Sequence, residues 1–256
     1  MLSKSQIKLI KSLEYKKYRD ETNLFVAEGN KVVGEFIKHK WKIHLLICTE
    51  SWAKANPDIS KNAIITGIEN IQKISFLKNP PEVIGVFYQK RLNIDTNYGS
   101  KLGLALDEIQ DSGNVGTILR VALWYGLDYV ILGDGCANLY STKVVQASAG
   151  AIAKINAWHE NLEQFFSKLN KNIPIYGTFL EGTPIYLANL TNNGVIILGN
   201  EGKGIRENLK PFVNYKLFIP FFPKNEKPID SLNVAVSAGI ICSEFRRNAF
   251  LSSNNY

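Results

Sequence analysis

Apolar residues follow two spacings along this chain, and the spacing changes from segment to segment. Short runs rich in β-branched and aromatic residues are typical of strands, whereas apolar residues at every third or fourth position are typical of helices that bury one face. By this pattern the predicted strands are residues 23–27, 43–48, 63–68, 82–88, 102–107, 128–132, 174–180, 195–199 and 215–220. The predicted helices are residues 5–19, 31–39, 51–55, 69–76, 114–124, 142–152, 162–169 and 231–247.

These strands and helices fall into two successive groups. Residues 89–100 between them are polar and lose the periodic pattern, so we expect a linker there and two domains, residues 1–95 and residues 96–256. The first group predicts a small α/β domain with four strands. In the second group strands alternate with helices, which favours a mostly parallel sheet whose ligands bind at the carboxyl ends of the strands. On periodicity alone, the second domain resembles a Rossmann-like sheet.

The composition is that of an ordinary globular protein, with 45% hydrophobic and 21% charged residues among 256. No apolar run is long enough to span a bilayer, and the N-terminal residues lack the apolar core of a signal peptide, so we expect a cytoplasmic protein with no membrane partner. Cys48, Cys136 and Cys242 are isolated and the three histidines form no ligand pattern. We therefore expect a reducing compartment and no metal site.

The net charge of +7 is unevenly distributed between the two predicted domains. Residues 1–95 hold 16 Lys and Arg against 10 Asp and Glu, whereas residues 96–256 hold 14 against 13. A basic excess in one domain indicates a polyanionic partner such as nucleic acid, because each neutralised phosphate releases condensed counterions. The alternative is a solvated, lysine-rich surface, and charge alone leaves both open.

Three polar clusters in the second domain each follow a predicted strand. They are LDEIQDSGNVGTILR (106–120), VIILGNEGKGIRENL (195–209, with a helix expected from Ile205) and IPFFPKNEKPIDSLNVAV (219–236). Taken singly, each also has an ordinary structural explanation: glycines turn corners in α/β units, a helical arginine forms ion pairs, and Ser or Asn caps a helix start. Neither glycine cluster has a GxGxxG fingerprint or a Walker A sequence, which argues against a dinucleotide-dependent oxidoreductase.

In combination and in this order, the clusters resemble the three motifs of the SpoU branch of the SPOUT superfamily. These proteins are S-adenosylmethionine-dependent RNA 2′-O-ribose methyltransferases that act on tRNA or rRNA. The similarity extends over residues 101–247, and FVAEGNKVVGEF (25–36) resembles the small ribosomal-protein-like RNA-binding α/β domain that often precedes the catalytic domain. The resemblance implies a mostly parallel α/β domain containing a deep trefoil knot. It also implies a homodimer joined through the knot region, with active sites completed across the interface.

The same resemblance implies roles for individual residues. The catalytic positions that it indicates are Asn114, Arg120, Glu201, Ser231 and Asn233. Because a guanidinium stays protonated, we expect Arg120 to bind the adjacent RNA phosphate and to stabilise developing alkoxide charge. Whether Arg120 also accepts the proton stays open. Asn114 and Glu201 would orient Arg120 and the ribose.

Binding of the methyl donor is expected mostly through backbone groups. The positions that the resemblance indicates are Thr178, Gly199, Ile219 and Leu232. No metal is implied, and the expected partners are the donor, the RNA and a second copy of the chain.

Two features depart from the family pattern. Ser112 replaces a proline that rigidifies the first turn, and the third motif has a longer loop without glycine, residues 221–230. Since that loop is expected to lie over the donor site, donor affinity or loop mobility would change. The alternative function is therefore a SpoU-like RNA-binding protein with weak or lost methyl transfer.

Overall fold

The computed structural model describes residues 2–90, 98–223 and 231–253, and it divides into two compact units. The first unit combines residues 1–91 with residues 140–154, and the second combines residues 92–139 with residues 155–256. The predicted linker and the boundary between residues 95 and 96 lie largely outside the described residues. Among the described residues, no helix combines the length and the apolar character needed to cross a bilayer.

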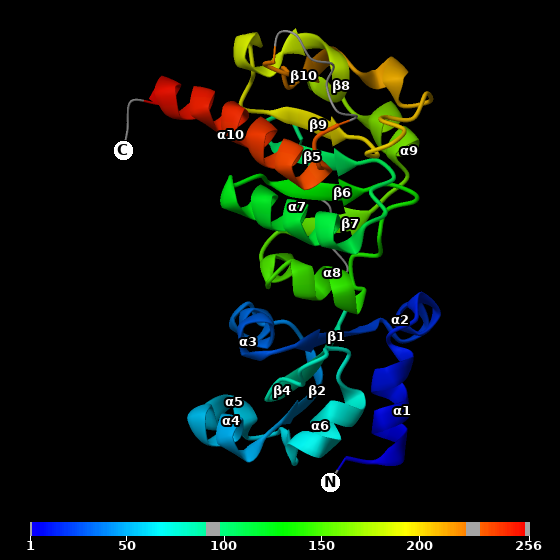
Figure 1. Cartoon of the computed structure of the whole chain (residues 1–256), viewed down its shortest axis with the longest axis vertical. Helices are drawn as coiled ribbons and strands as arrows, with labels where there is room; N and C mark the ends of the chain where they lie inside the picture. The colour runs from blue at the N-terminus through cyan, green and yellow to red at the C-terminus, as the bar shows by residue number, and fades with distance from the viewer. Residues whose placement is uncertain (1, 91–97, 224–230, 254–256) are drawn as a thin grey trace. The chain divides into compact units, whose positions relative to one another are not determined.

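The first unit is built on a four-stranded sheet with the strand order β1-β4-β2-β3. The strands are β1 Leu24–Glu28, β2 Ile43–Cys48, β3 Ile64–Ile65 and β4 Val83–Tyr88. β4 pairs antiparallel with both β1 and β2, while β2 and β3 are parallel. The helices are α1 Lys4–Ser12, α2 Lys16–Thr22, α3 Asn30–Lys38, α4 Glu50–Ala55, α5 Pro57–Ser60 and α6 Ile68–Ile74 (Figure 1).

The single helix predicted for residues 5–19 is wrong, because the chain turns between α1 and α2. Arg19 is buried, and its guanidinium donates to the carbonyls of Leu13 (2.8 Å) and Glu14 (2.6 Å). These carbonyls lie just after α1, where no further helical N–H reaches them. Residue spacing cannot distinguish an arginine that is buried and binds the carbonyls of a turn from an arginine on a solvated face. Burial of the Arg19 guanidinium lowers its pKa.

The single helix predicted for residues 142–152 is also shorter than expected. The segment forms α8 Thr142–Ala147 and a short 3-10 helix, η1 Ala151–Ala153, and both belong to the first unit. Ala149 (φ 49°) and Gly150 (φ 92°) adopt left-handed backbone conformations that end the helix. The ring of Tyr140 packs 4.8 Å from that of Phe25 in β1, so a tertiary contact assigns this segment to the first unit.

The second unit contains a six-stranded sheet with the order β10-β8-β9-β5-β6-β7. The strands are β5 Leu102–Leu106, β6 Tyr129–Leu132, β7 Asn156–His159, β8 Ile175–Pro184, β9 Gly194–Leu198 and β10 Tyr215–Phe218. Every strand pair is parallel, which confirms the predicted mostly parallel α/β sheet, although β7 was not predicted. The trefoil knot that the resemblance implies stays a prediction.

The helices of the second unit are α7 Ser112–Trp124, α9 Leu162–Lys168 and α10 Val234–Ser253. α7 and α10 pack against each other beside the sheet (Figure 1). The guanidinium of Arg246 in α10 donates to the carbonyls of Tyr125 (2.7 Å) and Gly126 (2.6 Å), which follow α7. The two helices are therefore held in a fixed relation at that end.

Two features of the sheet create the site at its carboxyl edge. β5 and β9 are neighbours in register, with Leu106 opposite Leu198, so the loops that follow them start side by side. β8 pairs with β10 up to Gly177 and resumes at Thr183, and residues 178–182 between them leave the ladder. These loops form the walls of a cavity.

Candidate functional site

The loop after β9 closes on itself through its own backbone. The N–H of Asn200 donates to the carbonyl of Gly204 (3.1 Å), and the N–H of Gly204 donates back to Asn200 (2.8 Å). The Asn200 side chain accepts from the N–H groups of Gly202 (3.0 Å) and Lys203 (3.1 Å) and donates to the carbonyl of Glu108 (2.8 Å). One amide side chain thus fixes the loop internally and ties it to the loop after β5.

Two glycines permit this closure for different reasons. At Gly199 a Cβ would lie 2.4 Å from the carbonyl carbon of Gly204 and 2.5 Å from the N of Ile205, so only glycine allows the two backbone segments to approach. Gly204 has a φ of +69°, which favours glycine on conformational grounds. The spacing of these glycines follows from a loop folded against itself.

The helix expected from Ile205 is wrong. Residues 205–209 are irregular and lead into a short 3-10 helix, η3 Lys210–Phe212. The backbone N–H of Arg206 donates to Asp107 Oδ2 (2.8 Å) and its Nε donates to Asp107 Oδ1 (2.6 Å). Pro211 also removes an N–H that a longer helix would need. No α-helix begins directly after this glycine loop.

The ion pair between Asp107 and Arg206 is a feature of the site that the sequence analysis did not predict. Asp107 follows β5 directly and is fully buried, while the Arg206 side chain is 27% exposed. A buried carboxylate requires a partner of this kind, since desolvation of an unpaired charge costs several kcal/mol. The sequence placed Asp107 at the end of a strand, but no spacing signal connects it with a residue on a loop 99 positions later.

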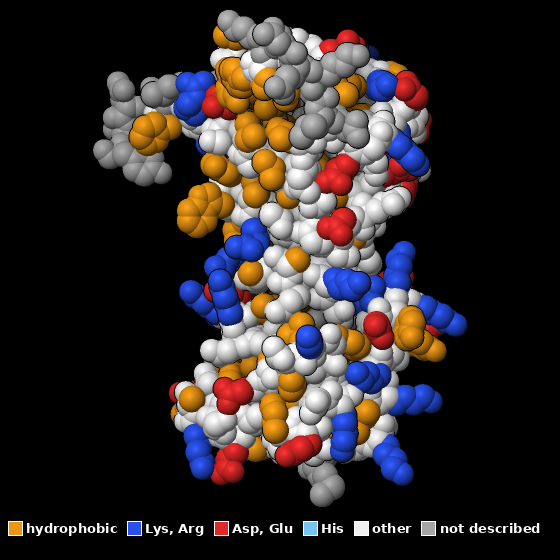
Figure 2. Space-filling view, in the orientation of Figure 1, with side chains coloured by type: hydrophobic (Ala, Val, Ile, Leu, Met, Phe, Trp, Pro, Cys, Tyr) orange, Lys and Arg blue, Asp and Glu red, His pale blue; other side chains and the backbone are white. Residues whose placement is uncertain are grey.

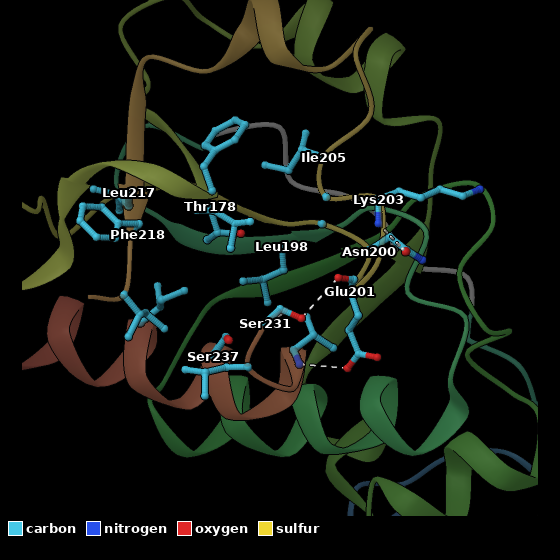
Figure 3. A pocket seen from close by; sticks show the side chains of 18 of the residues that line it. Thr178, Leu198, Asn200, Glu201, Lys203, Ile205, Leu217, Phe218, Ser231 and Ser237 are labelled. Atoms are coloured by element: carbon cyan, nitrogen blue, oxygen red, sulfur yellow. Dashed lines mark hydrogen bonds between the residues drawn. The ribbon is translucent and has the colours of Figure 1, made fainter. Parts of the chain in front are cut away.

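A cavity of about 740 Å³ lies at the carboxyl ends of β8, β9 and β10 (Figure 3). This volume falls within the range of about 300–1,000 Å³ that is usual for small-molecule sites. Its lining includes all four residues expected to contact a donor, Thr178, Gly199, Ile219 and Leu232. Glu201 and Ser231, two of the expected catalytic residues, also line it.

The inner wall of the cavity is largely apolar, with Leu198, Leu217 and Ile241 among its residues. The Thr178 hydroxyl donates to the carbonyl of Ile197 (3.0 Å). Ser237 on α10 also lines the cavity, and sequence reasoning missed it. In Figure 3 the Lys203 side chain extends away from the cavity.

Glu201 joins the three polar clusters of the sequence. Its Oε1 accepts from Asn114 Nδ2 (3.0 Å), Asn233 Nδ2 (3.1 Å) and the backbone N–H of Val234 (3.1 Å). Asn233 Nδ2 also donates to Asn114 Oδ1 (3.0 Å), which closes a triangle of side chains. The Ser231 hydroxyl donates to the Glu201 carbonyl (3.4 Å), as a dashed line in Figure 3 shows. Four of the five expected catalytic residues are therefore in contact.

Local capping positions two members of this triangle. Asp111 precedes α7, and its Oδ1 accepts from the N–H of Asn114 (2.7 Å). Asn233 precedes α10, and its Oδ1 accepts from the N–H groups of Ala235 (3.0 Å) and Val236 (3.3 Å). Sequence periodicity predicts that this helix begins at Ser231. The helix starts later than residue 231.

Arg120 is not brought into the triangle. It is exposed on α7, and no hydrogen bond or ion pair to it is found within the described part of the chain, so the structural ion-pair explanation finds no support there. Thr117, Arg120 and Trp124 recur at the spacing of one helix face, and Trp124 is 86% exposed. This face carries a cation and a large aromatic side chain, both outside the cavity lining.

Cys136, beside the loop after β5, is hydrogen-bonded within the protein and is not an activated thiol. Cys136 accepts from the N–H of Ile109 (3.3 Å) and donates to the carbonyl of Leu106 (3.2 Å), and burial raises its pKa to about 11. A thiol with that pKa stays protonated at neutral pH. Among the described residues, no group of three His, Cys, Asp or Glu side chains is arranged to hold a metal ion.

Comparisons with known proteins identify both parts of the chain. Residues 101–243 match the model of the SpoU rRNA Methylase family, and residues 4–85 match the model of an MRM3-like substrate binding domain. The chain is 28% identical over 244 residues to the 23S rRNA (guanosine(2553)-2′-O)-methyltransferase of Bacillus subtilis, covering 94% of this chain and 96% of that protein.

Solved structures are similar over the whole chain. A putative RNA methyltransferase of the TrmH family from Porphyromonas gingivalis has 35% identity and a TM-score of 0.86, covering 97% of this chain and 99% of that one. An AdoMet-bound rRNA methyltransferase from Sinorhizobium meliloti has 28% identity and a TM-score of 0.82, covering 97% of each chain.

Proposed function

We infer that this chain, which belongs to the SpoU rRNA methylase family, is an S-adenosylmethionine-dependent RNA 2′-O-ribose methyltransferase. The observation that carries this function is the Glu201 triangle at the mouth of the cavity, which joins all three family motifs. We propose rRNA as the substrate, because the relative that spans 94% of this chain is named a 23S rRNA enzyme. We also propose that the reaction takes place in the cytoplasm.

The cavity fits the donor chemically. When bound, S-adenosylmethionine supplies an electrophilic methyl group attached to a positively charged sulfur. The loop backbone at Gly202 and Gly204 is open to a ligand, since a Cβ at Gly204 meets nothing within 4 Å and one at Gly202 meets only Asn200 Oδ1 at 3.7 Å. The lining holds two carboxylates, Glu181 and Glu201, and two lysines, Lys203 and Lys210, which suits a ligand with groups of both charges. Thr178, Gly199, Ile219 and Leu232 are the proposed contacts.

The Glu201 triangle has a positioning role in this proposal. It holds the starts of α7 and α10 against the glycine loop, so Asn114, Ser231 and Asn233 present their polar groups in one place. Fixed geometry of this kind supplies much of the acceleration in a group transfer between two bound molecules. Glu201 and Asn114 orient the ribose whose 2′-hydroxyl attacks the methyl group.

Arg120 is proposed to bind the RNA phosphate beside that ribose and to stabilise the developing alkoxide. Because Arg120 is exposed on α7 and does not line its own cavity, we propose that it serves the cavity of a partner in a homodimer. The exposed face with Trp124 supports an interface on α7, since a side chain 86% exposed and of this size is suited to burial against a second copy. The knot region would form the rest of that interface.

The function is tested by titrating S-adenosylmethionine calorimetrically and by incubating the protein with tritiated donor and unmodified 23S rRNA transcript. We expect saturable donor binding and incorporation of label as a 2′-O-methyl nucleotide, which resists alkaline cleavage of its phosphodiester. Donor binding without label in rRNA or in tRNA would favour the alternative, an RNA-binding protein that has lost methyl transfer. Absence of donor binding would contradict the proposed cofactor.

Complementation tests the shared active site. Arg120→Ala is expected to lower kcat by about 10²–10³-fold, as for loss of one stabilising donor, with donor affinity unchanged. Gly199→Ala damages donor binding instead. If Arg120 acts in the partner's cavity, mixed dimers of the two variants hold one intact site, and co-refolding them restores activity. A mixture that stays as inactive as its components would show that Arg120 acts within its own chain.

A further inference from the structure

Three segments of the first unit carry net positive charge because they hold lysines and no acid. Residues 36–49, 83–90 and 140–154 contain six lysines, at positions 38, 40, 42, 90, 143 and 154, and neither Asp nor Glu. Some other lysines of the unit pair with carboxylates, as in the Lys54–Glu50 (2.9 Å) and Lys61–Asp58 (3.1 Å) pairs, although residues 1–13 also hold three lysines and no acid. Figure 2 shows blue side chains predominating over red ones on the visible face of this unit.

Tertiary contacts bring parts of these segments together. The Trp41 indole N–H donates to the carbonyl of Ala153 (3.2 Å), and its ring lies 6.4 Å from that of Tyr140. The hydroxyl of Tyr140 donates to the carbonyl of Lys90 (3.4 Å). The backbone N–H of Tyr88 donates to the carbonyl of Lys42 (3.0 Å), so the end of β4 lies beside the start of β2.

Lysines and rings alternate where these segments meet. Lys42 Nζ lies 4.5 Å from the centre of the Tyr88 ring, and Lys90 Nζ lies 5.9 Å from that of Trp41. His44 Nδ1 is 3.1 Å from the Tyr88 hydroxyl. We call this the lysine–aromatic surface and define it by Lys38, Lys40, Trp41, Lys42, His44, Tyr88 and Lys90.

The lysines of this surface form no ion pair within the described residues, although the charge of Lys38 acts on the nearby Glu35 carboxylate. Among the described residues, no carboxylate lies within ion-pair distance of Lys38, Lys40, Lys42 or Lys90. The acid closest in sequence, Glu35, is engaged by Lys154 (2.9 Å) and approached by His39 (3.7 Å). Lys40 also adopts a left-handed backbone conformation with a φ of 56°. This conformation is energetically less favourable for lysine than for glycine or asparagine.

We propose that the lysine–aromatic surface binds the phosphodiester backbone of the substrate RNA at a distance from the methylated nucleotide. Unpaired lysines supply the counterion-releasing contacts, and the partly buried rings of Trp41 and Tyr88 hold the lysine stems in place. This inference rests on the proposed function for the identity of the ligand. It assigns RNA affinity to a surface of the first unit that contains none of the methyl-transfer residues.

The test is filter binding of radiolabelled 23S rRNA transcript to the full chain between 50 and 200 mM salt. The triple variant Lys40→Ala, Lys42→Ala, Lys90→Ala removes three charges from the surface. We expect its log–log salt slope to fall by about two to three, at about 0.7–0.9 per lost phosphate contact. The KM for RNA should rise about tenfold or more, which is about 1.4 kcal/mol, while kcat at saturating RNA and donor affinity by calorimetry stay unchanged.

The matched control is the triple variant Lys54→Ala, Lys61→Ala, Lys73→Ala, which removes the same net charge elsewhere on the first unit. We expect its salt slope to change by less than one. Equal losses in the two variants would mean that binding follows net charge, and they would overturn the assignment, as would an unchanged slope in the surface variant. If the wild type binds rRNA but transfers no methyl group, the proposed function fails. The salt slopes of the two triple variants would still show whether the lysine–aromatic surface binds the RNA.

Discussion

Two loops follow neighbouring parallel strands at the carboxyl edge of the second sheet, and they differ in how their backbone continues. The loop after β5 leads through the Asp111 cap into the 13-residue helix α7, so it delivers side chains such as Asn114. The loop after β9 folds back on itself through Gly199, Asn200 and Gly204 and leads into no α-helix. It delivers backbone groups to the cavity.

The difference lies in what each loop's polar residues bind. In the first loop the Asp111 carboxylate satisfies the N–H of Asn114 at the start of the next helix. In the second loop the backbone N–H of Arg206 donates to the carboxylate of Asp107, a residue of the first loop. The second loop therefore depends on the first for its shape, while α7 depends on a cap of its own. Three substitutions test this asymmetry.

Asp107→Asn is expected to have the largest effect. It leaves Arg206 without its buried carboxylate, and breaking a buried pair costs about 3–5 kcal/mol, with the lower end expected because Arg206 is partly exposed. The free energy of unfolding is measured in urea, together with donor affinity by calorimetry. Asp128→Asn is the control, since its Oδ2 accepts from the N–H of Leu102 (2.8 Å) at the opposite end of β5. A donor Kd equally unchanged in both variants would refute the dependence of the second loop on Asp107.

Gly199→Ala is expected to have an intermediate effect that is confined to the second loop. The added methyl group overlaps the backbone of Gly204, and overpacking of this kind costs about 1–3 kcal/mol. We expect donor affinity to weaken about tenfold or more, as measured by calorimetry. Gly202→Ala is the control, because its Cβ would meet only Asn200 Oδ1 at 3.7 Å. Equal donor affinity in the two variants would contradict the close approach at Gly199.

Asp111→Ala is expected to have the smallest effect and to act on the first loop alone. Loss of the cap of α7 costs about 1 kcal/mol of stability. Donor affinity should stay close to the wild-type value, because the Asp111 side chain reaches the second loop only through Asn114. Asp111→Asn keeps an accepting oxygen and should retain most of the stability in thermal unfolding. A weakened donor affinity in Asp111→Ala would show that the two loops are coupled in both directions.

The sequence by itself determined five of the six strands of the second sheet and the order of the three clusters. Continuous apolar runs such as residues 195–198 predicted buried strands, and all strands of that sheet pair in parallel. These features depend on local periodicity, which a single sequence contains. The family resemblance indicated four donor-binding positions, and Thr178, Gly199, Ile219 and Leu232 all line the cavity.

Only the tertiary structure decided which residues meet. The pairing of Asp107 with Arg206, the place of residues 140–154 in the first unit and the burial of Arg19 each depend on contacts between distant segments. Such contacts leave no periodic trace, because a charged side chain has the same spacing whether it faces water or a buried carbonyl. The two glycine-containing clusters show the same limit of sequence-based prediction. Each has a strand followed by glycines and polar residues, yet an α-helix follows β5 and a closed loop follows β9. The hydrogen bonds to Asp107 decide between the two.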